Sequence, residues 1–443
     1  MTDVIAIFDI GKTNKKMLLF SENLSLVALQ EKVFPEITDD DGFPCDDIDA
    51  MTSWIYNSLN RVAKEGEYRI KALNFTTYGA TLVYLDENGK RLTPLYNYLK
   101  EMPKEVLNNF YERYGGIDEF SRQTASPALG MLNAGLQVLW LKRQKPEVFA
   151  RVKYILHFPQ YLSYLFTGKI TSEYTSIGCH TAMWDFDHQQ YHRWLTDEQL
   201  TLPEPESNLH LQSVILNGEK VQVGSGLHDS SASLIPYLEA SESKFILIST
   251  GTWSIFMNPF NHKPLTENQL KNDTLSFLSV KQKAVKSSRL FMGHIHQVEA
   301  ERLAAQYQLP ANSYKTVQAD ETIFRDCLSQ KKPSNFNEAY HALMLNLLKC
   351  SVEKMQLISE NSDFECIYIT GGFARNPLYT RLLATYFSDK QVYVSQIDNA
   401  TAFGGALLTS VAMGNTMPPI NLGLKQITPF HHLNLYNNES QNT

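Results

Sequence analysis

The first thirty-four residues alternate between apolar runs and short polar interruptions. Val4 to Phe8 is a β-branched and aromatic run, and Met17 to Phe20 resumes the apolar character after a polar turn. This spacing predicts a hairpin of two strands. The stretch "LSLVALQEKVF" (Leu24 to Phe34) predicts a third strand, antiparallel to the second because the connection is too short for a crossover helix.

The next pattern is helical. Asp47 or Asp49 can cap a helix that Gly66 ends. Strands are expected at residues 70–76 and 82–85, and the second of them turns at "DENG". Helices are then expected to dominate from Pro103 to about Trp194. The apolar residues at helical spacing in the first helix are Ile48, Met51, Ile55, Leu59 and Val62.

The second half of the chain repeats the plan of the first. "KFILISTGTWSIFMN" (Lys244 to Asn258) is again an apolar strand, a small-residue turn and a returning strand. A duplicated hairpin of this kind indicates two related lobes that face one ligand. Further on, a strand at Ile367 to Thr370 precedes a double glycine, and "NATAFGGALL" (Asn399 to Leu408) opens a helix with small residues on one face.

Composition narrows the class of protein. A chain of 443 residues fits two large domains, and 43% apolar with 20% charged residues is typical of a soluble globular protein. The net charge of −7, with both signs interspersed, argues against nucleic acid or an acidic membrane as partner. Five scattered cysteines without CxxC spacing indicate neither a disulfide framework nor a zinc site. With no export signal and no run of eighteen apolar residues, a cytoplasmic location is expected.

The polar turn after the first strand carries phosphate-binding chemistry. "GKTN" offers backbone N–H groups, the Thr13 hydroxyl and nearby ammonium groups. Asp9, at the end of the strand, is a candidate ligand for the hydrated Mg²⁺ that accompanies a polyphosphate. The stretch is not a P-loop, because GxxxxGK[ST] is absent. The alternative is that Asp9 and Asn14 only stabilise a tight turn.

Three later stretches add to this turn. In "STGTWS", Gly251 permits close backbone approach to a phosphate, and Thr250 and Thr252 add hydroxyl donors. "GSGLHDSSASLIPY" places Asp229 where it acts either as a helix N-cap or as the base that takes a proton from an attacking alcohol, with His228 structural or lining the pocket. "GGFARNP" leaves room for a flat ring, or forms a plain strand-to-helix turn.

These four elements, in this order, resemble the FGGY carbohydrate kinases, a family within the larger group of actin, hexokinase and heat-shock chaperone ATPases. The resemblance spans Ile5 to Leu408. It implies an α/β fold with two actin-like, ribonuclease H-like ATPase lobes and a cleft between them. The expected divisions are an N-terminal lobe at 1–230 with the sugar and first phosphate motifs, a C-terminal lobe at 231–430 with the second phosphate and adenosine motifs, and a polar tail at 431–443.

Within the family the chain most resembles the L-rhamnulose kinases. "STGTWSIFMNP" keeps a tryptophan after the glycine and threonine, and "TTYGATLVYLDENGK", "PLYNY", "SEYTSIGCHTAMWD" and "LFMGHIHQVEAERLA" are similar to their other segments. The resemblance implies transfer of the γ-phosphoryl group of ATP to a ketose, L-rhamnulose, with a 1-phosphate product. ATP and Mg²⁺ are the implied cofactors, the sugar is the implied partner, and a homodimer is compatible with the resemblance.

The resemblance also implies residue roles. Asp229 is the expected general base and Asp9 the expected metal ligand. The phosphates are assigned to Gly11, Lys12, Thr13, Asn14, Lys16, Gly251 and Thr252, and the adenosine to Gly371, Gly372 and Asn376. The sugar is assigned to Thr77, Tyr78, Gly79, Gln160, His228 and Asp229.

The chain departs from the family pattern mostly on the sugar side. Lys12 stands where threonine is usual, and it either strengthens the hold on the phosphates or points to solvent. Gln160 and Thr81 stand where aspartates are frequent, Phe373 replaces a third glycine, and Asn399 replaces a frequent glutamate. The alternatives are therefore a kinase for L-fuculose, L-xylulose or L-ribulose, a sugar- or nucleotide-binding protein without catalysis, and a chaperone-like ATPase. Asp9 and Asp229 together argue against the binding protein, because a pure sensor needs no base beside the sugar.

Overall fold

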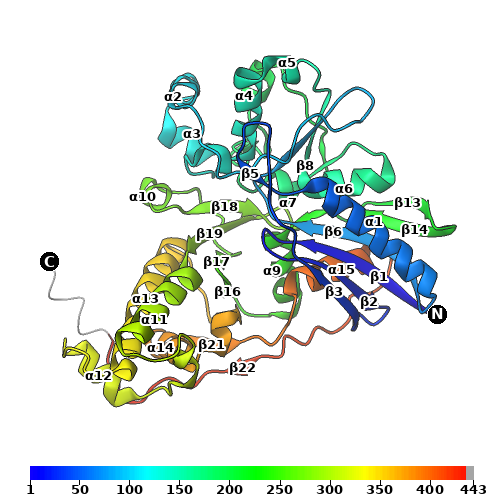
Figure 1. Cartoon of the computed structure of the whole chain (residues 1–443). Coiled ribbons are helices and arrows are strands. Elements are labelled where there is room, and N and C mark those ends of the chain that lie inside the picture. The colour runs from blue at the N-terminus through cyan, green and yellow to red at the C-terminus, as the bar shows by residue number, and fades with distance from the viewer. Residues whose placement is uncertain (436–443) are drawn as a thin grey trace. The chain divides into compact units, whose positions relative to one another are not determined.

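The computed structural model describes residues 1–435, and its internal contacts divide them into two units (Figure 1). The first unit comprises Met1–Glu239, Lys263–Ala284 and Asn399–Ile420. The second comprises Ala240–His262, Val285–Asp398 and the chain from Asn421 onward. The first unit thus includes two segments beyond the expected boundary at residue 230. Of the polar tail expected at 431–443, residues 436–443 lie outside the described part.

The first unit is built on a mixed sheet of seven strands. Its order is β13-β14-β6-β1-β2-β3, and β15 also pairs with β6. The hairpin of β1 and β2 is antiparallel, β3 continues antiparallel to β2, and β6 is parallel to β1. The strands are β1 Thr2–Ile10, β2 Lys15–Ser21, β3 Leu26–Lys32, β6 Tyr68–Thr77, β13 Leu211–Leu216, β14 Glu219–Gly224 and β15 Leu227–His228.

Helices and short strand pairs complete this unit. The helices are α1 Ile48–Glu65, α2 Lys104–Arg113, α3 Ile117–Gln123, α4 Ala134–Gln144, α5 Pro146–Phe149, α6 Phe158–Thr167, α7 Tyr174–Ile177, α8 Trp194–Asp197, α9 Asp229–Ala240, α10 Glu267–Lys271 and α15 Ala400–Ala412. The remaining strands are β4 Ile37–Thr38, β5 Pro44–Cys45, β7 Leu82–Leu85, β8 Tyr154–His157, β9 Ser172–Glu173, β10 Trp184–Asp185, β11 Gln190–Tyr191, β12 Pro205–Glu206 and β18 Leu275–Leu278.

Alternation along β1 explains how both faces of the sheet are covered. Phe8 and Ile10 belong to a core cluster with residues of α1 and α6. Ile5 and Ile7 belong to another cluster with residues of α9 and α15. Because side chains alternate between the faces of a strand, Asp9 lies on the Ile7 face, toward α9 and α15. The pattern therefore fixes where this carboxylate points.

The second unit is a smaller α/β unit. Its strands follow the order β19-β17-β16-β20-β21-β22, in which β16 and β17 form an antiparallel hairpin and β20 is parallel to β16. Ile246 and Ile248 face a core that includes residues of α11, α13 and α14. The elements are β16 Phe245–Thr250, β17 Ser254–Asn258, β19 Ala284–Leu290, α11 Met292–Gln306, α12 Glu321–Leu328, α13 Phe336–Ser359, β20 Cys366–Gly371, α14 Pro377–Tyr386, β21 Gln391–Val394 and β22 Lys425–Gln426.

Most of the predicted elements are present. Both hairpins are found, and α1 is capped by Asp47 and closed by Gly66 in the left-handed conformation, as predicted. The expectation that helices dominate from Pro103 to about Trp194 is confirmed, although the short strands β8 to β11 interrupt the helices. β7 pairs with β8 rather than extending the main sheet.

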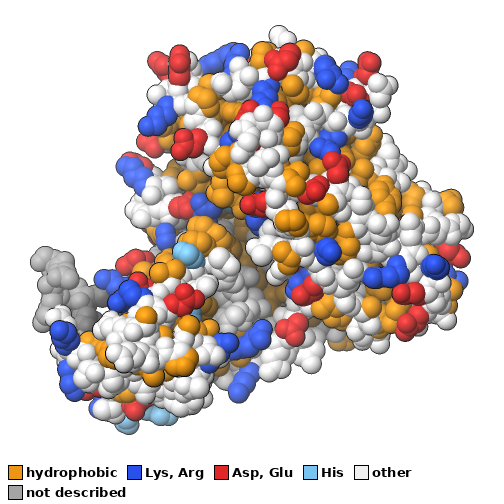
Figure 2. Space-filling model, viewed as in Figure 1, with side chains coloured by type: hydrophobic (Ala, Val, Ile, Leu, Met, Phe, Trp, Pro, Cys, Tyr) orange, Lys and Arg blue, Asp and Glu red, His pale blue; other side chains and the backbone are white. Residues whose placement is uncertain are grey.

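The surface agrees with the mixed charge pattern. Figure 2 shows acidic and basic side chains interspersed over the face in view, as the net charge of −7 leads one to expect. Among residues 1–435, no helix is both long and apolar enough to cross a membrane.

Candidate active site

Asp9 is a half-buried carboxylate near the end of β1. It faces Lys16 across β2 and Thr76 across β6 in the strand register, and its Oδ1 accepts a hydrogen bond of 2.9 Å from the Thr76 hydroxyl. Burial, and secondarily the charge of Asp229, raises the pKa of Asp9 from 3.8 to about 6, although Thr76 and Lys16 act in the opposite direction. The predicted metal ligand and the predicted base are therefore close enough to repel each other.

The turn after β1 is tight and open to solvent. The Gly11 N–H donates to the Asn14 carbonyl at 3.0 Å, and the side chains of Thr13 and Asn14 are exposed. Lys16 lies on β2, where its ammonium donates to Asn399 Oδ1 at 2.8 Å. Asn399, just before α15, is a neighbour of the turn that the sequence argument did not assign to the site.

Lys12 is occupied by carboxylates. Its Nζ lies 2.7 Å from Asp46 and 3.4 Å from Glu36. Burial disfavours the charge of Lys12, but the hydrogen bond to Asp46 together with the charges of Asp46 and Glu36 outweighs burial and raises the pKa of Lys12. These contacts differ from both expectations for Lys12, which were a phosphate contact and a free position in solvent. A phosphate role for Lys12 stays a prediction.

Asp46 connects the turn after β1 with Tyr78, the residue that follows β6. Besides Lys12, it accepts hydrogen bonds from Lys15 Nζ at 3.0 Å and from the Tyr78 hydroxyl at 2.7 Å. Lys15, only 1% exposed, also donates to the Lys12 carbonyl. Neither Asp46 nor Lys15 was predicted, because their importance depends on contacts between segments thirty residues apart.

Asp229 begins α9. Its Oδ1 accepts the Ser230 N–H at 2.6 Å and lies 3.4 Å from His228 Nε2. One third of its side chain is exposed, which leaves the carboxylate accessible to a ligand. The structure thus gives Asp229 the position at a helix start that was expected, with His228 beside it.

A small cavity lies next to His228 in the same unit. It is lined in part by Tyr78, Gly79, His157 and Ser176. Gly79 is needed there, because a Cβ at this position would lie 2.9 Å from the His228 ring. Thr77, the residue before Tyr78, is buried, and its hydroxyl donates to the Tyr78 carbonyl. Three of the predicted sugar residues, Tyr78, Gly79 and His228, therefore line this cavity, and a fourth, Thr77, precedes Tyr78 in the chain.

Gln160 has a different environment. It is fully buried on α6, and its amide donates to the carbonyls of Ser225 and Gly226 at 3.1 and 3.2 Å. These contacts support the segment that leads to His228 and Asp229. A direct contact of Gln160 with the sugar stays a prediction.

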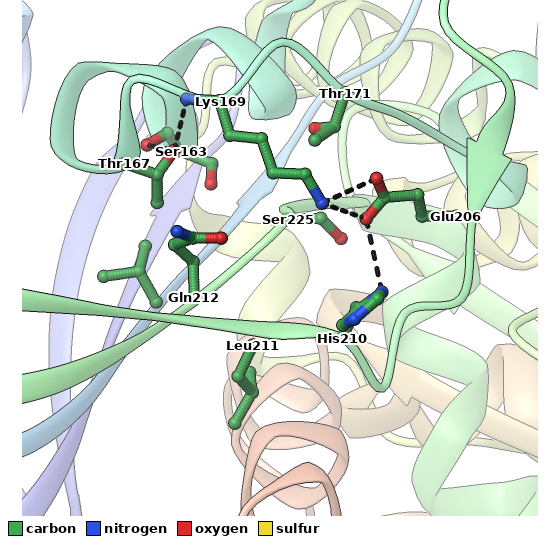
Figure 3. Close-up of a pocket in the computed structure, with 10 residues that line it drawn as sticks. Ser163, Thr167, Lys169, Thr171, Glu206, His210, Leu211, Gln212 and Ser225 are labelled. Atoms are coloured by element: carbon green, nitrogen blue, oxygen red, sulfur yellow. Dashed lines mark hydrogen bonds and ion pairs between the residues drawn. The ribbon is translucent and has the colours of Figure 1, made fainter.

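A second polar pocket lies on the other side of Ser225 (Figure 3). Lys169 and Glu206 form an ion pair of 2.6 Å across it, and His210 lies 3.4 Å from Glu206. Thr171 also lines it, and its buried hydroxyl has no hydrogen-bond partner within the described chain. None of the residues predicted for catalysis lines this pocket.

In the second unit, the turn after β16 is exposed. Gly251 and Thr252 are solvent-accessible, and the Gly251 N–H donates to the Trp253 carbonyl at 2.9 Å. The start of α11 packs on this turn: the Gly293 N–H donates to the Thr252 carbonyl, and a side chain at Gly293 would overlap Gly251. The predicted phosphate turn is therefore supported by a helix N-terminus.

The two adjacent glycines, Gly371 and Gly372, have different surroundings. Gly371 has a φ of 84°, and a Cβ there would overlap the Thr250 carbonyl, whereas nothing lies within 4 Å of a Cβ on Gly372. Asn376 caps α14 by accepting the N–H groups of Leu378 and Tyr379. Its amide also donates to the Tyr340 hydroxyl, so its observed contacts are structural.

Comparisons with known proteins identify the family of this chain. The sequence model described as "FGGY family of carbohydrate kinases, N-terminal domain" matches residues 4–234, and "Carbohydrate kinase FGGY, C-terminal domain" matches residues 242–417. A protein named rhamnulokinase from Halalkalibacterium halodurans is 23% identical, covering 92% of this chain and 93% of its own. A protein named rhamnulokinase from Oceanobacillus iheyensis is also 23% identical, covering 91% of this chain and 92% of its own.

Solved structures show the same fold. A carbohydrate kinase from Novosphingobium aromaticivorans superposes with a TM-score of 0.80 at 22% identity, covering 97% of this chain and 94% of that one. A ligand-bound xylulose kinase from Lactobacillus acidophilus gives a TM-score of 0.80 at 16% identity, over 96% and 92%.

Proposed function

The chain belongs to the FGGY family of carbohydrate kinases, and on this premise we propose that it transfers the γ-phosphoryl group of ATP to the 1-hydroxyl of a ketose, L-rhamnulose. The convergence of Asp9 and Asp229 carries the proposal. Desolvation and, to a smaller extent, the charge of Asp229 raise the pKa of half-buried Asp9 to about 6, and the side chain of Asp229 is a third exposed. The rhamnulokinases at 23% identity support the choice of sugar.

In this proposal Asp229 accepts the proton of the attacking hydroxyl. A positioned base of this kind contributes about 10² to 10⁴ in rate, and positioning with charge stabilisation supplies most of the remainder. His228 Nε2, at 3.4 Å, helps to hold the carboxylate in place. The Ser230 N–H bond fixes Oδ1 and leaves Oδ2 for the substrate.

Residues of each unit are proposed to bind the nucleotide. In the first unit these are Gly11, Thr13, Asn14 and Lys16, and in the second they are Gly251, Thr252, Gly371 and Gly372. Exposed backbone and hydroxyl donors at the turns support this assignment.

Asp9 fits a magnesium ion. It is a half-buried carboxylate whose charge is disfavoured by desolvation and by Asp229, so a nearby divalent cation would stabilise its ionised form. Bound Mg²⁺ would neutralise charge on the phosphates during transfer. Calorimetric titration of MgADP at pH 6, in two buffers of different ionisation enthalpy, should show proton release that the Asp9→Asn variant lacks. Equal proton release in both proteins would contradict the assignment.

An ADP-release assay over a panel of ketoses tests the function itself. We expect release to depend on sugar and to be fastest with L-rhamnulose. Faster release with L-fuculose, L-xylulose or L-ribulose would change the substrate but keep the reaction. Release without sugar would indicate an ATPase, and no release with any sugar would indicate a binding protein.

A further inference from the structure

The cavity beside His228 is very small. Its volume is about 10 Å³, which is room for one water molecule or one hydroxyl group. Gly79 and Tyr78 form one side of it, and the end of β8 with the start of α6 forms another. Because only a single small group can enter a cavity of this size, the polar atoms that line it determine which chemical group is bound.

Three polar atoms around this cavity are unpaired. His157 Nε2, Ser176 Oγ and His228 Nδ1 are all buried, and none has a hydrogen-bond partner among residues 1–435. Buried polar atoms are normally paired, so three unpaired atoms around one cavity indicate a missing partner. The backbone of Ser176 is fixed, because its N–H donates to the buried carboxylate of Glu173 at 2.5 Å.

The chemistry of these atoms matches a hydroxyl group. Burial, with a smaller contribution from His228, lowers the pKa of His157 to about 4, so its imidazole is neutral at physiological pH. A neutral imidazole has one donor and one acceptor nitrogen, and a serine hydroxyl both donates and accepts. A methyl group would leave all three atoms unpaired.

We propose that this cavity is a subsite for one hydroxyl group of the sugar, with His157 and Ser176 as its specificity-determining residues. The inference rests on the proposed sugar kinase function and adds how the sugar is selected. His228 joins the subsite to the catalytic carboxylate, since its Nδ1 is the unpaired atom and its Nε2 lies 3.4 Å from Asp229. Nothing in the sequence resemblance assigns His157 or Ser176.

The test compares the best ketose of the panel with its monodeoxy analogues. In the wild type, one analogue should lose at least about tenfold in kcat/KM, because a site built for a hydroxyl rejects the compound that lacks it. In Ser176→Ala and His157→Leu this discrimination should collapse, mainly through loss of kcat/KM for the parent sugar. His157→Gln, whose amide also donates and accepts, should restore part of it.

Thr171→Val is the matched control. Thr171 also carries a buried hydroxyl without a partner in residues 1–435, but it lines the other pocket (Figure 3) and should leave the discrimination unchanged. Ser176→Ala removes one oxygen only and decides the question if His157→Leu does not fold. If the wild type phosphorylates a ketose and these variants keep its preference, the subsite is refuted while the function stands. If no ketose is phosphorylated, the proposed function itself fails.

Discussion

Replacing Asp9 by asparagine should make the protein more stable and inactive. The carboxylate is ionised at neutral pH against the effect of burial and of Asp229, and these raise its folded-state pKa from 3.8 to about 6. Asparagine has nearly the same shape, and its carbonyl oxygen still accepts the hydrogen bond from Thr76. The substitution therefore removes the charge and little else.

The size of the expected gain in unfolding free energy follows from proton linkage. Between the two pKa values the folded protein binds more protons than the unfolded chain, so the wild type loses stability as the pH rises from about 4 to about 6. The full penalty is then present at higher pH. A shift of about two units corresponds to about 3 kcal/mol at pH 8, and the same relation leaves less than about 1 kcal/mol at pH 4.

Urea denaturation at pH 4 and pH 8 measures this difference. Asp9→Asn should exceed the wild type by up to about 3 kcal/mol at pH 8, and the two should nearly coincide at pH 4. Asp3→Asn is a control on the same strand, with the opposite sign. Arg69 donates to Asp3 and lowers its pKa, so neutralising Asp3 should destabilise the protein at pH 8, with a deficit that shrinks toward pH 4.

A destabilised Asp9→Asn at pH 8 would refute the reasoning. So would a gain in stability that does not change with pH, because the linkage argument requires the gain to disappear once the wild-type carboxyl is protonated. Loss of sugar-dependent ADP release in the stabilised variant would show that Asp9 is needed for activity although it lowers stability.

Four further substitutions have defined outcomes. Asp229→Asn should lower kcat by about 10² to 10⁴ while calorimetry shows unchanged binding of an ATP analogue, and near-native turnover would remove Asp229 from the mechanism. Gly371→Ala should lower the melting temperature markedly, because the new Cβ overlaps Thr250. Gly372→Ala should fold normally, and it should raise the KM for ATP if the nucleotide lies against Gly372. Equal melting temperatures of the two variants would contradict this difference. Lys12→Met should leave the KM for ATP within about threefold, because Lys12 is held by Asp46; a larger rise in KM would place Lys12 on the phosphates.

The sequence predicted local structure well where that structure is determined by residues close together in the chain. The hairpin of β1 and β2, the Asp47 cap and the glycine that closes α1 all depend on neighbouring residues, and all are present. The segment from Pro103 to Trp194 was less predictable. Its strands β8 to β11 are two to four residues long, too short to show an alternating pattern.

The residues of the candidate site also differ in how far the sequence could predict them. Asp9, Asp229 and the glycine turns could be identified, because each carries chemistry in its own short stretch. Asp46 and His157 could not, because Asp46 acts through Lys15 and Tyr78, and His157 is identified only by an unpaired nitrogen facing a cavity. Contacts between distant segments have no signature in a single sequence.

The return of residues 399–420 to the first unit has a consequence for synthesis. Ile5 and Ile7 leave the ribosome among the first residues, but Ala402, Ala406 and Leu407, which cover them, are made some four hundred residues later. One face of the earliest strand, which α9 covers only in part, is therefore not fully covered until almost the entire chain has been made. We expect nascent chains that stop before Asn399 to expose this apolar face and to depend on chaperones, however complete their N-terminal sequence is.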